Sequence, residues 1–256
     1  MATTLSTPLD QTPARKGGIA PLWHTIALAG FVLLLSLAGA FSNHARANAH
    51  HILGYAQTIA IEILMVAYIV WGLRQRGFRL RELTGERWKS PEQFLLDVGI
   101  ALGAWFGLLA VQTIAGLVAL KLHWLDMNKA EQMRKSLDFL LPRSGVEIAA
   151  FAALCVTAGV CEEIIFRGYF QKQIGAWIGN LWLGTLISSL LFAMAHGYQG
   201  PLRMGIIALI GFSLGIVANL RRNLRPGMMT HAWFDFCQGV LFPRLLKSLE
   251  GLHKGM

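Results

Sequence analysis

The sequence predicts an all-α fold, a polytopic transmembrane helical bundle of about seven spanning helices, with six to eight as the range. Two observations lead to this prediction. Of the 256 residues, 54% are hydrophobic and only 14% are charged, and the apolar residues are gathered in long runs. Soluble domains carry about 25% charged residues, so this chain is too poor in charge to cover a globular surface. No run alternates with period two, as a membrane β-barrel requires.

Seven apolar runs supply the predicted helices. They are Leu22–Phe41, Ile52–Leu73, Phe94–Leu120, a run that begins at Val146, Leu181–His196, Met204–Leu220 and Met228–Leu246. Most reach the ~20 residues that cross a ~30 Å hydrocarbon core at about 1.5 Å per residue. The fifth and sixth runs are shorter, and we expect them to span only with the support of neighbouring helices.

The net charge of +9 is interpreted as a topology signal, because Lys and Arg lie in the links between apolar runs. The link 74–93 is the densest basic cluster and is placed in the cytoplasm, with the N-terminus and the link Arg221–Arg225 on the same side. This predicts an integral protein of the plasma (inner) membrane, in contact with lipid and not with nucleic acid. The basic stretch Lys121–Arg143 would lie outside, with an interfacial helix over 130–141.

The two ends of the chain are predicted to add little structure. Residues 1–20 are interpreted as a disordered cytoplasmic lead-in, and 247–256 as a short tail. Ala38–Ala40 resembles a signal-peptide cleavage site, but the first run is longer than the 7–15 residues of a signal core, so we expect it to be retained. No cysteine has CxxC spacing, so all are predicted to be free. The cysteines are Cys155, Cys161 and Cys237.

Ionisable residues inside apolar runs are functional candidates, since an Asp, Lys or Arg at a helix centre costs roughly 2.5–3.5 kcal/mol. The fourth run contains Glu162, Glu163 and Arg167. Glu163 and Arg167 are four residues apart and can pair along one helical face, which leaves Glu162 free to act as a base. The alternative is an inert ion pair at a helix end near the headgroups.

Two later runs carry histidines. His196 closes the fifth run, where a lone histidine is more often a hydrogen-bonded interfacial residue than a ligand. His231 and Asp235 are four residues apart, a spacing that suits a shared metal, a carboxylate that orients an imidazole, or a simple ion pair. Together the three runs hold the groups that hydrolysis needs: a base, imidazoles and a cation that orients a carboxylate.

At these residues the chain resembles the CAAX protease and bacteriocin-processing (CPBP, or ABI) family of intramembrane proteases, which includes CAAX prenyl proteases and lysostaphin-resistance-A-like proteins. Its pattern is EExxxR, FxxxH and Hxxx(N or D) on successive helices. Here the pattern is met by Glu162, Glu163, Arg167, Phe192, His196, His231 and Asp235. The resemblance covers roughly 146–246, the predicted catalytic core. Residues 21–145 match only as extra membrane helices.

The resemblance implies an intramembrane endopeptidase in which Glu162 activates a water. Glu163 and Arg167 would orient this base, while the two histidines and Asp235 would stabilise the tetrahedral oxyanion or hold the water. Members are described both as metalloproteases and as glutamate-dependent proteases. The cofactor is therefore either none or a divalent ion such as zinc, and the chain lacks HExxH. The candidate metal ligands would be Glu162, His196, His231 and Asp235. The best-known eukaryotic members have Asn in place of Asp235.

The predicted function is cleavage of a peptide or membrane-anchored protein at or in the membrane. Whether the substrate is prenylated is left open. The rivals are a non-catalytic immunity or scaffolding protein of the same fold, and a small proton-coupled transporter that uses the buried Glu and His groups. The intact triple motif argues against a decayed enzyme, and the lack of an inverted repeat argues against a transporter.

Spacing offers a test of the geometry. A hairpin at Gly179–Asn180 would bring Glu162 level with His196. Straight helices would leave His231 at another depth, unless the chain breaks around 197–201.

For Glu62, in the second run, a structural role is favoured over a helper role in the site. A solvated outer loop is favoured over a metal site for three other histidines. These are His44, His50 and His51.

Overall fold

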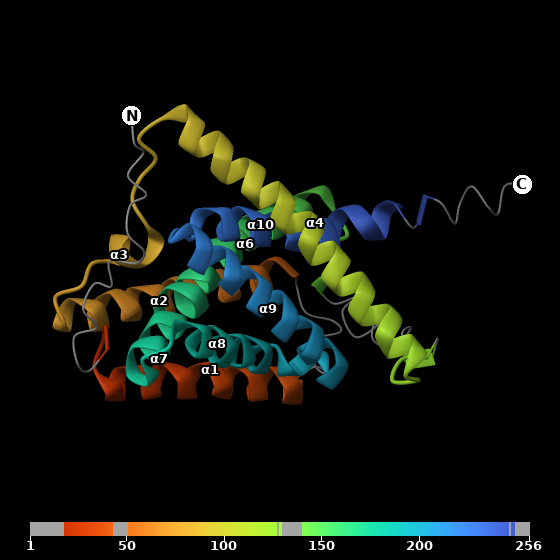
Figure 1. Ribbon diagram of the computed structural model, residues 1–256. Helices are drawn as coiled ribbons and strands as arrows, with labels where there is room; N and C mark the ends of the chain where they lie inside the picture. The colour runs from red at the N-terminus through yellow and green to blue at the C-terminus, as the bar shows by residue number, and fades with distance from the viewer. Residues whose placement is uncertain (1–17, 43–50, 127, 130–139, 246, 249–256) are drawn as a thin grey trace, which may run out of the picture.

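The computed structural model describes residues 18–42, 51–126, 128–129, 140–245 and 247–248, and within them all regular structure is helical (Figure 1). The long helices are α1 (Leu22–Ser42), α2 (His51–Gln75), α4 (Pro91–Lys121), α6 (Gly145–Glu162), α8 (Leu181–Ala195), α9 (Pro201–Arg221) and α10 (Arg225–Phe236). Shorter elements connect or extend them. These are α3 (Leu80–Thr84), η3 (Glu163–Phe170), α7 (Gln171–Ile178), η4 (Gly197–Gln199) and η5 (Cys237–Leu241).

Five helical segments are long and apolar enough to cross a membrane, which confirms the predicted all-α polytopic class. They are Leu22–Gly39, His51–Gln75, Pro91–Lys121, Gly145–Ile178 and Pro201–Arg221. The fifth predicted run is short as expected, since α8 has 15 residues and extends about 22 Å. The sixth run is not short, because α9 starts three residues earlier, at Pro201.

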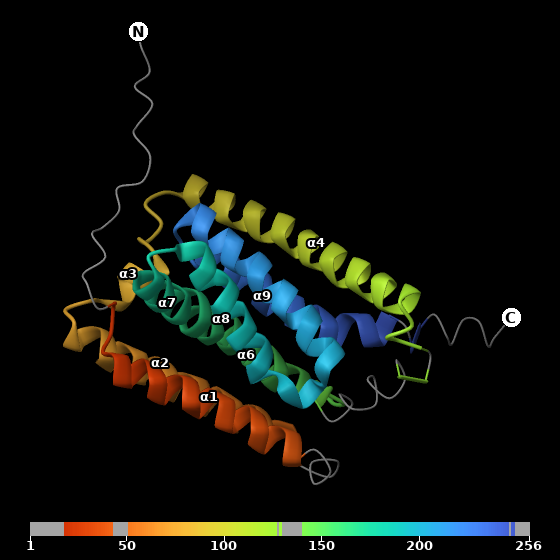
Figure 2. The same cartoon turned by 60° about the horizontal axis from the view of Figure 1, so that its bottom comes forward.

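The two basic links meet at one end of the bundle, as Figure 2 shows for the α3–α4 link and the α9–α10 turn. The Leu224 backbone N–H donates to the Thr84 carbonyl at 3.2 Å. Arg221 forms an ion pair with Asp97 at 2.7 Å. The structure therefore places both links on one side, as their charge predicted. That this side is cytoplasmic stays a prediction.

The hairpin between α7 and α8 forms where the sequence predicted it. Gly179 has a left-handed φ of 74°, a conformation that glycine adopts at little cost. Asn180 then caps α8, because its side-chain oxygen accepts from the backbone N–H groups of Trp182 and Leu183. Gly184 lets the two helices touch: a Cβ there would lie 2.4 Å from the Gln171 carbonyl oxygen.

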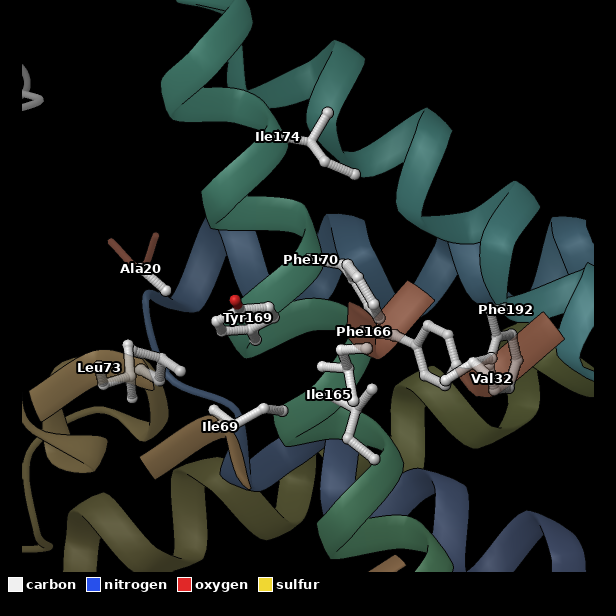
Figure 3. Close-up of a cluster of buried hydrophobic side chains, with 12 residues drawn as sticks. Ala20, Val32, Ile69, Leu73, Ile165, Phe166, Tyr169, Phe170, Ile174 and Phe192 are labelled. Atoms are coloured by element: carbon white, nitrogen blue, oxygen red, sulfur yellow. The ribbon is translucent and has the colours of Figure 1, made fainter. Parts of the chain in front are cut away.

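A buried apolar cluster surrounds η3 and holds it in the middle of the bundle. Figure 3 shows Ile165, Phe166, Tyr169 and Phe170 packed with side chains from α1, α2 and α8. The hydroxyl of Tyr169 also lies 2.8 Å from the Thr25 hydroxyl of α1. The N-terminal helices are thus part of the support of the fourth span.

Several predictions fall at the margins of the described residues. Residues 130–139 of the expected interfacial helix lie outside them, as do His44, His50 and most of the lead-in and tail. His51 is not in a loop, since it begins α2 and lies 3.4 Å from the Glu147 carboxylate. Residues 19 and 20 are docked, because their backbone N–H groups donate to Gln173. All three cysteines are free, as predicted.

The close approach of α7 and α8 gives a first prediction. Gly184→Ala should lower the free energy of unfolding by about 1–3 kcal/mol, because the added methyl group meets backbone atoms that cannot move aside. Equilibrium unfolding in mixed detergent micelles measures this. Gly205→Ala is the control, since its Cβ would point into open space. Equal stability of the two variants would show that the contact is not tight.

Candidate active site

The site is built around a π-helical segment, η3, which joins α6 to α7 without a break. Every residue of η3 is buried. A π-helix widens the turn and leaves carbonyl groups to be satisfied from elsewhere, and such segments are frequent at functional sites. Here the hydroxyl of Ser188, on α8, donates to the Phe166 carbonyl at 2.6 Å. The segment is therefore held by a neighbouring helix as well as by its own backbone.

The predicted pair of Glu163 and Arg167 is confirmed. Nη1 of Arg167 donates to Oε1 of Glu163 at 2.8 Å, and the two side chains are 1% and 0% exposed. Nδ1 of His231 lies 3.0 Å from the same Oε1. One buried carboxylate oxygen thus joins η3 to α10. The second oxygen of Glu163 and Nη2 of Arg167 are buried and have no hydrogen-bond partner among the described residues.

The other edge of His231 faces two carboxylates whose side chains are partly exposed at the surface. Nε2 of His231 lies 3.6 Å from Oε2 of Glu162 and 3.5 Å from Oδ2 of Asp235. These two side chains are 17% and 37% exposed. The site therefore has a sealed half, Glu163 with Arg167, and a reachable half, Glu162 with Asp235. His231 lies between them, and its predicted i,i+4 contact with Asp235 is present.

Phe192 connects the remaining histidine to this arrangement. The guanidinium of Arg167 lies over the Phe192 ring, 4.3 Å from the ring centroid. The same ring meets His196 edge-on at 4.7 Å between centroids and His231 at 5.8 Å. His196 caps the C-terminal end of α8, and its Nδ1 lies 2.9 Å from the Phe192 carbonyl. The aromatic ring is a wall shared by Arg167 and both histidines.

His196 and His231 lie at the same level of the bundle, and not at the different depths that straight helices would impose. Both rings touch Phe192, because α8 ends after 15 residues, short of the ~30 Å core. The chain then breaks where the sequence analysis required it. η4 is a short 3₁₀ turn, and Gly200 has a φ of 88° before α9 begins at Pro201.

Glycine at the crossing of α6 and α10 sets the distance across the site. A Cβ at Gly159 would lie 2.8 Å from the Ala232 backbone nitrogen and 2.8 Å from the Met228 carbonyl. Gly159 is one turn before Glu163, and Ala232 directly follows His231. The Glu163–His231 hydrogen bond therefore depends on two helices that touch backbone to backbone.

The candidate metal ligands do not converge as a metal site. Among the described residues, no three His, Cys, Asp or Glu side chains are placed to hold a metal ion. Nδ1 of His231 is engaged by Glu163, and Nδ1 of His196 faces the Phe192 carbonyl. These Nδ1 contacts orient the two rings and leave Nε2 of each as the nitrogen available to a substrate, a water or a metal ion.

Two residues adjoin the site that the sequence analysis did not place there. Glu62 of α2 is buried and interacts electrostatically with Glu162, although a structural role had been favoured for it. Its position in an apolar run was the available signal. Tyr198 stacks on His196 with centroids 6.2 Å apart and interacts electrostatically with Glu162 and Asp235. Its place in the break after α8 carries no sequence signal for such a position.

Comparison with known proteins identifies the segment that carries this geometry. Residues 144–237 match the family model described as type II CAAX prenyl endopeptidase Rce1-like. Over these residues the chain is similar to that family. The Rce1-like segment runs from the residue before α6 to the first residue of η5, and it includes all six predicted site residues. The match to a membrane-protease family and the apolar helices together show that the chain is an integral membrane protein. No curated protein and no solved structure matches it.

The buried ion pair gives a second prediction. Arg167→Met should lower the free energy of unfolding by about 3–5 kcal/mol, because it leaves the Glu163 carboxylate buried without its cation. Glu163→Gln/Arg167→Met should recover part of that loss, since no buried charge then lacks its partner. Unfolding in mixed micelles measures both, with Arg74→Met, at the exposed end of α2, as control. A loss below about 1 kcal/mol for Arg167→Met would contradict the account.

Proposed function

We propose that the protein is an intramembrane endopeptidase that hydrolyses a peptide bond at or in the membrane, with Glu162 as the general base. The observation that carries the proposal is the placement of Glu162. It is the partly exposed neighbour of a fully buried ion pair, 3.6 Å from His231 and inside the Rce1-like segment. A carboxylate so placed can take a proton from a water that its neighbours help to hold.

The proposed reaction uses only these side chains. Glu162 accepts a proton from the water as the water oxygen attacks the carbonyl carbon of the substrate. The carbonyl becomes a tetrahedral oxyanion, next to the Nε2 edge of His231 and to His196. The carbon–nitrogen bond then breaks, and Glu162 returns its proton to the leaving amine. One water is consumed, and a carboxylate and an amine are released.

The sealed half of the site fixes His231 in the tautomer that this reaction needs. The Glu163 carboxylate can only accept a hydrogen bond, so Nδ1 of His231 must carry the proton between them. In the cationic ring Nε2 also carries a proton, which faces the reachable side of the site. Arg167 lies on the far side of Glu163 and holds that carboxylate in place.

Asp235 supports the ring instead of the oxyanion in this proposal. Its Oδ2 lies 3.5 Å from Nε2 of His231, on the same helix and one turn further on. A charged carboxylate would repel an oxyanion, but it stabilises a neighbouring imidazolium. This accounts for an aspartate at a position where the best-known eukaryotic members have asparagine. We further propose a peptide or membrane-anchored protein as the substrate.

The third prediction concerns catalysis. Glu162→Gln should lower the rate of peptide hydrolysis by about 10²–10⁴-fold, because the amide cannot accept the proton of the water. His196→Ala should lower it by about 10²–10³-fold through lost oxyanion stabilisation. The assay is cleavage of a peptide library by the purified full-length chain in detergent. Glu86→Gln is the matched control, since this carboxylate is exposed in the α3–α4 link and should leave the rate unchanged.

Two outcomes would overturn the proposal. Wild-type protein that cleaves no peptide, or a Glu162→Gln variant as active as wild type, would remove the protease assignment or the base. Metal analysis of the same samples tests the side-chain mechanism separately. Chelator treatment should leave the rate unchanged, whereas a lost rate that zinc restores would establish a metal-dependent reaction.

A further inference from the structure

A cavity lined by none of the proposed catalytic residues lies at the end of the bundle where the two basic links meet. Its volume is about 350 Å³. The α3–α4 link, the first turns of α4 and the α9–α10 turn line it. Its charged and aromatic lining residues are Glu86, Arg87, Trp88, Lys89, Asp97, Arg221 and Arg225, so that cations outnumber carboxylates by four to two. None of them belongs to the predicted site.

Of the two carboxylates, the buried one, Asp97, is already neutralised by its partners. Asp97 is buried, and one of its oxygens accepts from Arg221 at 2.7 Å. The other oxygen accepts from Asn223 at 2.8 Å and from the indole N–H of Trp88 at 2.9 Å. The carboxylate is therefore a structural anchor for the surrounding cations and offers little repulsion to an incoming anion.

Only some of the cations in the cavity wall are engaged with partners in the protein. Arg225 donates to the backbone carbonyls of Gly85 and Glu86 and lies over the Trp88 ring. The side chains of Arg87 and Lys89 are exposed and make no hydrogen bond or ion pair within the described part of the chain. Two cations are thus available at the rim of a cavity whose interior cations are fixed in place.

An apolar surface begins directly beside these cations. Phe94, Leu95 and Leu96 of α4 are exposed, and the Trp88 ring meets the Phe94 ring edge-on at 5.0 Å. α4 is one of the candidate membrane spans, so this surface faces acyl chains. A ligand that fits both features has an anionic head at the level of the cations and an apolar tail along α4.

We propose that this cavity binds the phosphate group of an anionic phospholipid, with the exposed side chains of Arg87 and Lys89 as its ligands and Arg221 and Arg225 as its fixed wall. The lipid would bind with its acyl chains against the exposed apolar residues of α4. Free phosphate has the same charge chemistry but gains nothing from that apolar surface. The binding does not depend on peptide hydrolysis, so it can be tested whether or not the protein is a protease.

The test is the thermal unfolding midpoint of the full-length protein in neutral detergent. Dihexanoyl phosphatidylglycerol should raise the midpoint in a saturable way, and dihexanoyl phosphatidylcholine or inorganic phosphate at the same concentration should raise it less. Arg87→Gln/Lys89→Gln should weaken the apparent affinity for phosphatidylglycerol by roughly 30-fold, the combined effect of two basic residues at a membrane surface. Neither side chain supports the fold, so the double variant should unfold like wild type without lipid.

The matched control is Arg74→Gln/Arg81→Gln, which removes the same charge from the same end of the bundle but outside the cavity. It should retain wild-type affinity within about threefold. An equal loss in both double variants would overturn the site in favour of general attraction by a basic surface. Equal stabilisation by inorganic phosphate would overturn the lipid as the ligand. Wild-type affinity in Arg87→Gln/Lys89→Gln would overturn the proposal altogether.

Discussion

One oxygen of the Glu163 carboxylate receives Arg167 from its own π-helical segment and His231 from α10, and all three side chains are buried. A buried charge without its partner costs several kcal/mol, and in a membrane protein the surroundings offer no water to replace that partner. The bundle must therefore keep η3 and α10 in contact. Glu162 is the next residue along the chain, so the same constraint fixes the base beside His231.

The helices can obey this constraint because small residues surround the buried pair. A Cβ at Gly227 would lie 3.1 Å from Oε2 of Glu163, and one at Gly211 would lie 3.2 Å from Nη2 of Arg167. The Gly211 Cβ would also lie 3.0 Å from the Phe192 ring. Three helices thus close around two charged groups without a side chain in between. This packing keeps the sealed half dry and leaves exposure to Glu162 and Asp235.

Local rules predicted much of this arrangement, and tertiary contacts supplied the rest. The low content of charged residues and the long apolar runs predicted a membrane protein. The i,i+4 spacing predicted the two pairs that lie on single helices, Glu163 with Arg167 and His231 with Asp235. The hydrogen bond between Glu163 and His231 joins residues 68 apart, and no local pattern encodes it. The common depth of the two histidines depends on where α8 ends, and the sequence could state it only as a condition, a break around 197–201. Glu62 and Tyr198 adjoin the site through packing between helices.

The most direct test of this account is a double-mutant cycle between Glu163 and His231, read as free energies of unfolding in mixed micelles. The variants are Glu163→Gln, His231→Gln and the double variant. If one shared carboxylate holds η3 to α10, the two substitutions should couple by about 1–3 kcal/mol. Losses that add to within about 0.5 kcal/mol would show that the residues act independently, and would contradict the claim that this contact organises the site.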